Sequence, residues 1–207
     1  GLLKSKKNKN KTDKKFPAFT FKIGGEAGYG IMSAGLTFSR IACRSGYHIF
    51  DYTEYPSIIR GGHNVMQTTF SENIVRAPLK QTDFLVALNQ DTVNRHKDEL
   101  TAGSGLLFDG EQKIDVSGVP ASVELFPVPI NRLAREIGGS EIMRNTVALG
   151  AVMALLGGKL GHLKDLITAE FGAKKPEVVE KNHASCQAGY DFIRENYPDK
   201  VKPVLAG

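Results

Sequence analysis

The sequence predicts an α/β fold: a three-layer, Rossmann-like domain with a mixed, mostly parallel sheet and helices on both faces. Three observations predict this class. A β-prone run at 19–23 leads through a glycine-rich stretch into a helical run and a second strand. Residues 83–89 (DFLVALN) contain a short continuous apolar run that ends at an asparagine, which is typical of a strand covered on both faces. Helical periodicity dominates beyond residue 130, and strands that alternate with helices indicate the α/β class.

The first unit is a strand, a loop and a helix. FTFKI alternates apolar and polar side chains, and GGEAGYG (24–30) breaks the alternation. From Ile31 the apolar residues recur at helical spacing, and Gly46 ends that pattern. HIFDY (48–52) is predicted to be the second strand. Because the helical run is long enough for a crossover, we expect these two strands to form a parallel βαβ unit.

The middle of the chain predicts the rest of the sheet. Residues 65–70 and 74–78 are β-prone runs separated by a polar break, so we expect an antiparallel pair. A helix capped by Asp91 is expected after the central strand at 83–89, because a side-chain oxygen can accept the first helical amides. The remaining predicted elements are strands at 103–110 and 122–129 and helices at 130–137, 143–156, 163–171 and 176–196.

Length and charge indicate one domain with two irregular ends. The chain has 207 residues, a usual size for a single domain. Seven lysines and one aspartate lie within 1–15, whereas the rest of the chain carries 20 basic and 21 acidic side chains. We therefore expect a lysine-rich disordered arm at 1–16, a folded domain at 17–197, and a linker or C-terminal tail at 198–207. Because the domain itself is not basic, no nucleic-acid partner is expected.

Location and metal chemistry are also limited by the sequence. No run approaches the roughly 18 apolar residues of a membrane-spanning helix, and the lysine-rich start lacks the apolar segment of a signal peptide. We expect a soluble, cytoplasmic protein with no membrane partner. Cys43 and Cys186 are too few for a disulfide framework or a four-cysteine cluster. Both are expected to be buried thiols, and no metal ligand is assigned in this chain.

The glycine-rich stretch at 24–30 is the first candidate site. Its four glycines let the backbone approach a ligand, and the amides at a helix N-terminus attract phosphate or carboxylate. The candidate binding residues are Gly24, Gly25, Gly28 and Gly30. The alternative interpretation is that these glycines only allow a tight turn between strand and helix.

A dinucleotide-binding fingerprint is matched only in part. Gly28 and Gly30 fit the first two glycines of GxGxxG, but Ser33 stands where the third is required. Asp51, 21 residues beyond Gly30, is placed as a ribose-binding acid would be. A freestanding, NAD-binding oxidoreductase of the Rossmann type is therefore an open alternative.

The segment EYPSIIRGGHN (54–64) is the second candidate site. It follows the C-terminal end of a predicted strand, at the edge where open α/β sheets bind ligands. Arg60 can clamp a phosphate or carboxylate, and Gly61 and Gly62 leave room for a ligand beside the backbone. His63 can donate a hydrogen bond or titrate near neutral pH. The alternatives are a surface ion pair for Arg60 and a structural role for His63.

Five blocks in order carry a resemblance to a known family. They are FKIGGEAGYGIMSAG, EYPSIIRGGHNVMQTTFSE, DFLVALN, RNTVALGAVMALLG and NHASCQAGYDF. Over 19–192 the chain resembles the gamma domain of the 2-oxoacid:ferredoxin (acceptor) oxidoreductases. The first two blocks are most similar to the N-terminal gamma domain of fused gamma-alpha subunits, which commonly act on 2-oxoglutarate.

The resemblance implies an oxidoreductase that is active only within a multi-subunit complex. Such enzymes convert a 2-oxoacid, coenzyme A and oxidised ferredoxin into acyl-CoA, CO₂ and reduced ferredoxin. Thiamine diphosphate, Mg²⁺ and 4Fe-4S clusters are held by the partner alpha and beta domains, or by a delta subunit. The gamma domain is implied to hold none of these by itself, and to contribute to coenzyme A binding and to assembly of the complex.

Both lines of argument converge on an anionic nucleotide at the two candidate loops. The phosphates of coenzyme A suit a glycine turn at a helix N-terminus together with an arginine. Family loops commonly have glutamine where this chain has Glu26, and its carboxylate would repel phosphate unless it points away or caps the helix. A pure assembly module, whose loops contact only partner domains, is a further alternative. We expect the two loops to meet at one edge of the sheet.

Overall fold

The computed structural model describes residues 18–28, 30–54, 62–73, 80–173 and 175–206. The strands are β1 (Phe19–Glu26), β2 (His48–Glu54), β3 (His63–Ser71), β4 (Thr82–Ala87), β5 (Leu100–Asp109) and β6 (Glu124–Val128). The helices are α1 (Ile31–Arg44), α2 (Gln90–His96), α3 (Ile130–Glu136), α4 (Arg144–Leu155), α5 (Leu160–Phe171) and α6 (Pro176–Asn196). Three 3₁₀ turns are η1 (Lys97–Glu99), η2 (Glu141–Met143) and η3 (Pro198–Lys200). The predicted lysine-rich arm lies outside the described residues.

The sheet is mixed and mostly parallel, as predicted. Its order is β2-β3-β1-β4-β5-β6, and β3 runs against the other five described strands. Strands β1 and β2 run parallel, as expected for a βαβ unit, but they are not neighbours, because β3 inserts between them and pairs antiparallel with both. Nearly every β3 side chain is buried, which suits an interior strand and not an edge hairpin. The second half of the expected hairpin, 74–78, lies outside the described residues.

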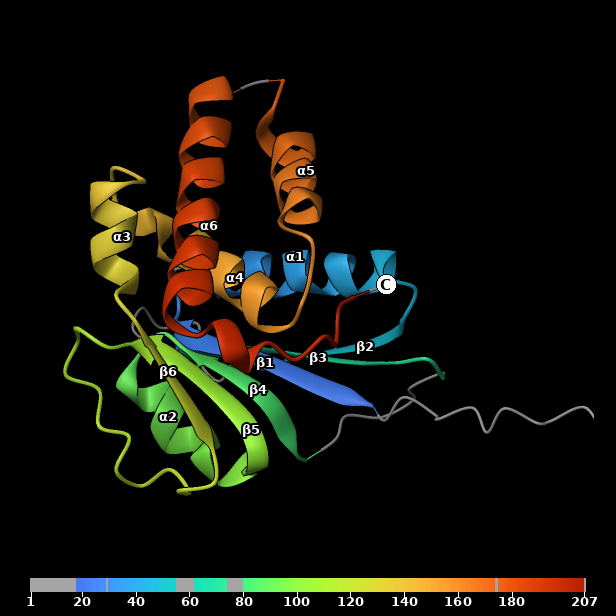
Figure 1. The fold of residues 1–207 in the computed structure, drawn as a ribbon, viewed down its shortest axis with the longest axis vertical. Coiled ribbons are helices and arrows are strands. Elements are labelled where there is room, and N and C mark those ends of the chain that lie inside the picture. The colour runs from blue at the N-terminus through green and yellow to red at the C-terminus, as the bar shows by residue number, and fades with distance from the viewer. Residues whose placement is uncertain (1–17, 29, 55–61, 74–79, 174, 207) are drawn as a thin grey trace, which may run out of the picture.

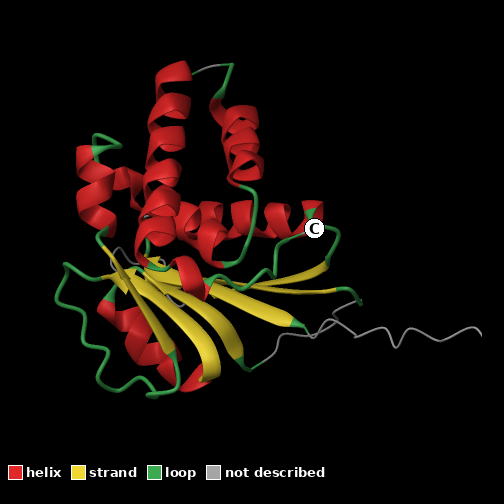
Figure 2. Cartoon of the chain, viewed as in Figure 1, coloured by secondary structure: helices red, strands yellow, loops and turns green. Residues whose placement is uncertain are grey.

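Helices cover both faces of the sheet, so the predicted three layers are present (Figure 1). Short α2 lies on one face, over a core of side chains from β4 and β5. The larger core lies on the other face, where α1, α3, α4 and α6 pack and α5 stands beside α6. Figure 2 shows that all long helices lie on this second face. No helix in the described ranges is both long and apolar enough to span a bilayer.

Helix α1 packs on β3 through a close approach of Gly35. A Cβ atom on Gly35 would overlap the Met66 side chain, so only glycine lets this helix lie so near the strand. Phe38 on α1 stacks on Phe21 of β1 with ring centroids 3.8 Å apart. Cys43 lies on the opposite, exposed side of the helix, so its prediction as a buried thiol is wrong. The apolar periodicity of this helix covers only one side of it, and Cys43 is on the other.

Helices α4 and α6 cross at two small residues. A Cβ on Gly150 would overlap the backbone of Cys186, and a Cβ on Gly189 would overlap the backbone of Val147. Cys186 is buried as predicted, and burial raises the pKa of its thiol to about 11. This crossing fixes α6 against α4, and α4 is buried on all sides from Val147 to Leu155.

Two local expectations differ from the structure. The cap of α2 is Asn89 and not Asp91, because Asn89 has extended dihedral angles and its Oδ1 accepts from the Thr92 amide at 3.0 Å. The end of the chain, expected as a linker or tail, is folded back against the domain as far as Leu205. Its Leu205 amide donates to the Leu156 carbonyl at 2.8 Å, and the Leu205 side chain is buried.

Candidate functional site

The glycine-rich stretch divides into a strand end and a turn. Strand β1 continues through Glu26, so Gly24 and Gly25 belong to the strand and not to the loop. A Cβ on Gly24 would meet Thr92 and His63 on the α2 face, whereas one on Gly25 would meet Ile31 on the α1 face. These two glycines therefore allow close packing on both sides of the sheet edge, and the turn itself begins at residue 27.

The turn proper depends on two positive φ angles. Gly28 has φ of 91° and Gly30 has φ of 75°, which side chains other than glycine rarely adopt. Gly30 is the N-cap of α1, and no side chain accepts from the first amides of the helix among the residues described. The first turn of α1 also contains no acidic residue. The partial positive charge of this 14-residue helix is consequently not balanced by its own sequence.

A cavity of about 610 Å³ opens beside this turn. Gly28 and Gly30 line it together with Ser33 and Thr37 from the first two turns of α1. An apolar wall from α4 and α5 closes the other side, and it consists of Leu149, Leu163, Ile167 and Phe171. A volume of this size, with apolar walls and a few polar groups, is usual for a small-molecule site.

Charged groups of both signs border the cavity. Arg144 and Asn145 lie at the start of α4, and Asn145 Nδ2 is 3.4 Å from the position that a Gly30 Cβ would take. Glu141 also lines the cavity, but Arg135 Nη1 lies 2.5 Å from its Oε1 and offsets its charge. Glu170 is the second bordering carboxylate. The sequence analysis did not single out Arg144 or Asn145 as site residues, although both stand in the RNTVALG block that carries the family resemblance.

The two candidate loops meet at one edge of the sheet, as expected, within the described residues. Glu26 is opposite His63 in the β1–β3 pairing, and the Ala27 amide donates to the Gly62 carbonyl at 2.7 Å. Arg60 and Gly61 lie outside the described residues. The structure therefore brings Gly62 to the glycine turn directly.

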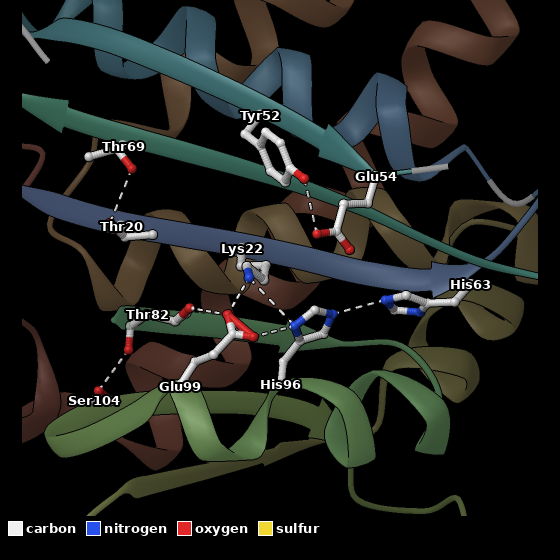
Figure 3. A network of polar contacts seen from close by, with 10 residues as sticks. All are labelled: Thr20, Lys22, Tyr52, Glu54, His63, Thr69, Thr82, His96, Glu99 and Ser104. Atoms are coloured by element: carbon white, nitrogen blue, oxygen red, sulfur yellow. Dashed lines mark hydrogen bonds and ion pairs between the residues drawn. The ribbon is translucent and has the colours of Figure 1, made fainter. Parts of the chain in front are cut away.

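The His63 side chain does not face the cavity. It turns to the α2 face of the sheet and is 3% exposed (Figure 3). Its Nε2 lies 2.9 Å from His96 Nε2, and His96 Nδ1 lies 2.5 Å from Glu99 Oε2. Lys22 of β1 completes this series of contacts through an ion pair with Glu99. His63 thus ends a buried polar network on the far side of the sheet.

The pKa values in this network shift in the directions that its geometry requires. Burial lowers the pKa of His63, the neighbouring His96 lowers it further, and Asp91 partly opposes this. Burial by itself would raise the pKa of Glu99, but hydrogen bonds from His96 and Lys22 outweigh that effect and lower it. The network therefore favours an ionised Glu99 and a neutral His63.

The remaining candidate residues are engaged elsewhere. Asp51 Oδ1 accepts from the Ser39 hydroxyl at 2.5 Å and from the Thr68 hydroxyl at 2.8 Å, in the middle of β2. Because β3 separates β2 from β1, Asp51 does not border the glycine turn as a ribose-binding acid must. Glu26 is exposed and makes no cap hydrogen bond to α1. In the described ranges, no group of three His, Cys, Asp or Glu side chains could hold a metal ion.

Known proteins are similar to this chain in sequence. The chain is 33% identical to the ketoisovalerate oxidoreductase subunit VorA of Methanothermobacter thermautotrophicus, over 89% of this chain and 38% of that protein. It is 28% identical to the 2-oxoglutarate synthase subunit KorC of Methanothermobacter marburgensis, over 84% of this chain and 96% of that one. The chain thus spans about two fifths of the VorA relative.

A solved structure of the same kind of enzyme is also similar to this chain. The 2-oxoglutarate:ferredoxin oxidoreductase from Magnetococcus marinus, with 2-oxoglutarate, coenzyme A and succinyl-CoA bound, superposes with a TM-score of 0.82 at 26% identity. The match covers 92% of this chain and 33% of that one. The family model of pyruvate ferredoxin/flavodoxin oxidoreductase matches residues 20–192, which is most of the folded part. The chain therefore belongs to the pyruvate ferredoxin/flavodoxin oxidoreductase family.

Proposed function

We propose that this chain is the gamma component of a thiamine-diphosphate-dependent 2-oxoacid:ferredoxin oxidoreductase. The complete enzyme would convert a 2-oxoacid, coenzyme A and oxidised ferredoxin into acyl-CoA, CO₂ and reduced ferredoxin. Thiamine diphosphate, Mg²⁺ and 4Fe-4S clusters would lie in partner alpha and beta domains, or in a delta subunit. The chain would contribute to coenzyme A binding and to assembly, and would be inactive alone.

Two kinds of relative support this proposal. One is a complete subunit, KorC, whose length this chain almost matches. The others are longer chains, namely VorA, of which it covers 38%, and the Magnetococcus enzyme, of which it covers 33%. The same domain therefore occurs both as a separate subunit and as part of a larger one. The partner domains would select the 2-oxoacid.

The observation that carries the coenzyme A proposal is the cavity beside Gly28 and Gly30. Its open helix N-terminus and Arg144 suit a phosphate, and its apolar wall suits the uncharged arm of the molecule. Glu26 raises no conflict, because it lies outside this lining and across from His63 on β3. Of the relatives above, the Magnetococcus enzyme is described with coenzyme A bound. We infer that the phosphates would lie at the turn.

The other candidate residues receive more specific roles in this proposal. Gly24 and Gly25 would act through packing, and Gly62 through its hydrogen bond to Ala27. His63 would act through position and not by contact with coenzyme A. Arg60 is still proposed as a phosphate ligand, and Arg60→Ala should then weaken coenzyme A binding in the assembled enzyme by about 1 to 3 kcal/mol.

Ser33→Glu tests the cavity directly. Ser33 lies in the first turn of α1, where a carboxylate favours the helix, so the fold should persist while phosphate is repelled. In the complex reconstituted with its partner subunits, we expect the KM for coenzyme A to rise at least tenfold with the KM for the 2-oxoacid unchanged. Leu36→Glu is the matched control, because it adds the same charge on α1 outside the cavity lining.

The same experiment separates the alternatives. An unchanged KM for coenzyme A in both Ser33→Glu and Arg60→Ala, with normal co-purification of the partners, would support a pure assembly module. Tight binding of NAD to the chain alone in isothermal titration would contradict the proposed function. Turnover of a 2-oxoacid by the chain without partners would contradict it as well.

A further inference from the structure

The network on the α2 face links four ionisable side chains from three parts of the chain (Figure 3). Lys22 comes from β1, His63 from the start of β3, and His96 and Glu99 from α2 and the turn that follows it. Lys22, His63 and His96 are all less than 10% exposed. Such a buried network is stable only when its donors and acceptors match, so its protonation states are determined by geometry.

Hydrogen-bond chemistry assigns the tautomers in order. An ionised Glu99 can only accept, and its Oε2 lies 2.5 Å from His96 Nδ1, whereas the Lys22 ammonium is 3.5 Å from that nitrogen and donates to Glu99 instead, so His96 carries its proton on Nδ1. The Nε2 of a neutral His96 is then an acceptor, and His63 must donate its own Nε2 proton across 2.9 Å. His63 Nδ1 is consequently left without a proton. It is buried, it has no hydrogen-bond partner among the described residues, and it lies 3.9 Å from Asp91 Oδ2.

His63 is also mechanically connected to the glycine turn. It pairs with Glu26 at the end of β1, and the residue before it, Gly62, accepts the Ala27 amide. Ala27 is followed directly by Gly28. A displacement of the His63 backbone would therefore move the base of the turn that lines the cavity.

We propose that His63 is a positioning residue for this turn, held by Lys22, Glu99 and His96, and that the histidine pair takes up a single proton at His63 Nδ1. The proton comes from water and forms an N–H bond that faces the Asp91 carboxylate. Asp91 is half exposed and already bound to Arg95, so it can shift from Arg95 toward the new donor. The turn would be held in one position at a pH above this protonation and would shift at a pH below it. A change in coenzyme A binding when the turn shifts would rest on the proposed function, whereas the tautomers do not.

Charged groups on every neighbouring element bear on this proton. The groups that act on His63 directly are Glu54 on β2 and Asp91, Arg95 and His96 on α2. Lys22 on β1 and Glu99 in η1 contact His96 and act on His63 through it. Asp91 and Glu54 favour the added proton, whereas His96 and Arg95 oppose it. A second proton would place two imidazolium rings in contact, so only one is expected.

Nuclear magnetic resonance of the intact chain, with ¹⁵N-labelled histidine, tests the tautomers without any variant. We expect His96 as the Nδ1–H form and His63 as the Nε2–H form at pH 8. Acidification should protonate the pair once, with the new proton on His63 Nδ1. A His96 in the Nε2–H form, or two independent protonations between pH 8 and pH 5, would overturn the proposal.

Glu99→Gln tests the link to the turn. A glutamine amide can either donate or accept, so the fixed order of tautomers is lost while the side-chain shape is retained. We expect hydrogen exchange at the Ala27 amide to accelerate at least tenfold. Glu111→Gln, which opens an exposed pair with Arg132, is the matched control and should leave Ala27 unchanged. Equal exchange in the two variants would overturn the positioning role.

The outcomes remain distinguishable from those of the proposed function. The tautomer and exchange measurements need neither coenzyme A nor partner subunits. If these measurements give the expected results while Ser33→Glu leaves the KM for coenzyme A unchanged, the proposal for the histidine network is supported and the assignment of the cavity to coenzyme A is contradicted. If Glu99→Gln does not fold, the pH dependence of Ala27 exchange in the unmodified chain decides, and a constant exchange rate after correction for the intrinsic rate would contradict the proposal.

Discussion

Gly28 and Gly30 differ from Gly24 and Gly25 in what their missing side chains allow. The first pair adopts positive φ angles beside a cavity, whereas the second pair lets α1 and α2 approach the sheet. His63 and Asp51 differ from expectation in a similar way, because the side chain of each is hydrogen-bonded to a neighbour inside the fold. At this scale, chemical type alone suggested ligand contacts, and neighbours determined which residues can make them.

A close contact between two helices gives a residue-scale prediction. Gly150→Ala places a methyl group on the Cys186 backbone, where neither partner can yield easily. We expect a loss of about 1 to 3 kcal/mol in the free energy of unfolding, measured by urea denaturation. Gly161→Ala in α5 meets no atom within 4 Å and should be neutral or stabilise by up to about 1 kcal/mol. Equal effects in the two variants would show that the crossing is looser than described.

Secondary-structure elements follow the sequence pattern closely except at their ends and pairings. Helix α6 has the predicted bounds, with Pro176 in its first turn. The α2 cap and the end of β1 were each misplaced by two or three residues, because asparagine and glycine fit more than one backbone position. The pairing of β3 was missed because alternation within a strand does not identify its neighbours.

The α2 cap yields a prediction at the scale of the element. Asn89 Oδ1 accepts from both the amide and the hydroxyl of Thr92. Asn89→Ala should lower the free energy of unfolding by about 0.5 to 2 kcal/mol. Asp91→Ala removes an exposed pair with Arg95 and a carboxylate 3.9 Å from His63 Nδ1, and should cost less than about 1 kcal/mol. Urea denaturation of the two variants decides between the caps, and a larger loss in Asp91→Ala would restore the original assignment.

The whole molecule keeps its two candidate regions on opposite faces of one sheet edge. The cavity lies on the face of α1 and α4, and the histidine network lies on the face of α2. Between them lies the end of the β1–β3 pairing, where Glu26 is opposite His63 and the Ala27 amide donates to the Gly62 carbonyl. A ligand on one face and a proton on the other can therefore act on the same backbone.

Global stability should depend on pH through His63. Its pKa in the folded chain is below the usual value of about 6.5, so the unfolded chain binds more protons as the pH falls through that value. The free energy of unfolding is expected to be highest above pH 6.5 and to decrease below it. Glu99, with its lowered pKa, should add a second loss only in the more acidic range below its usual value. His63→Gln should remove the first decrease, and an unchanged profile in urea denaturation would contradict this assignment.

The sequence by itself determined the α/β class, the order of the elements, the family resemblance and the convergence of two loops at one edge. These depend on local periodicity, glycine placement and short motifs, which involve residues that are close together in the sequence. Only the tertiary structure decided that β3 separates β1 from β2, that His63 points away from the cavity, and that Arg144 and Asn145 approach the glycine turn. Those facts depend on which side of a strand faces which helix, and contacts between residues far apart in sequence set that choice.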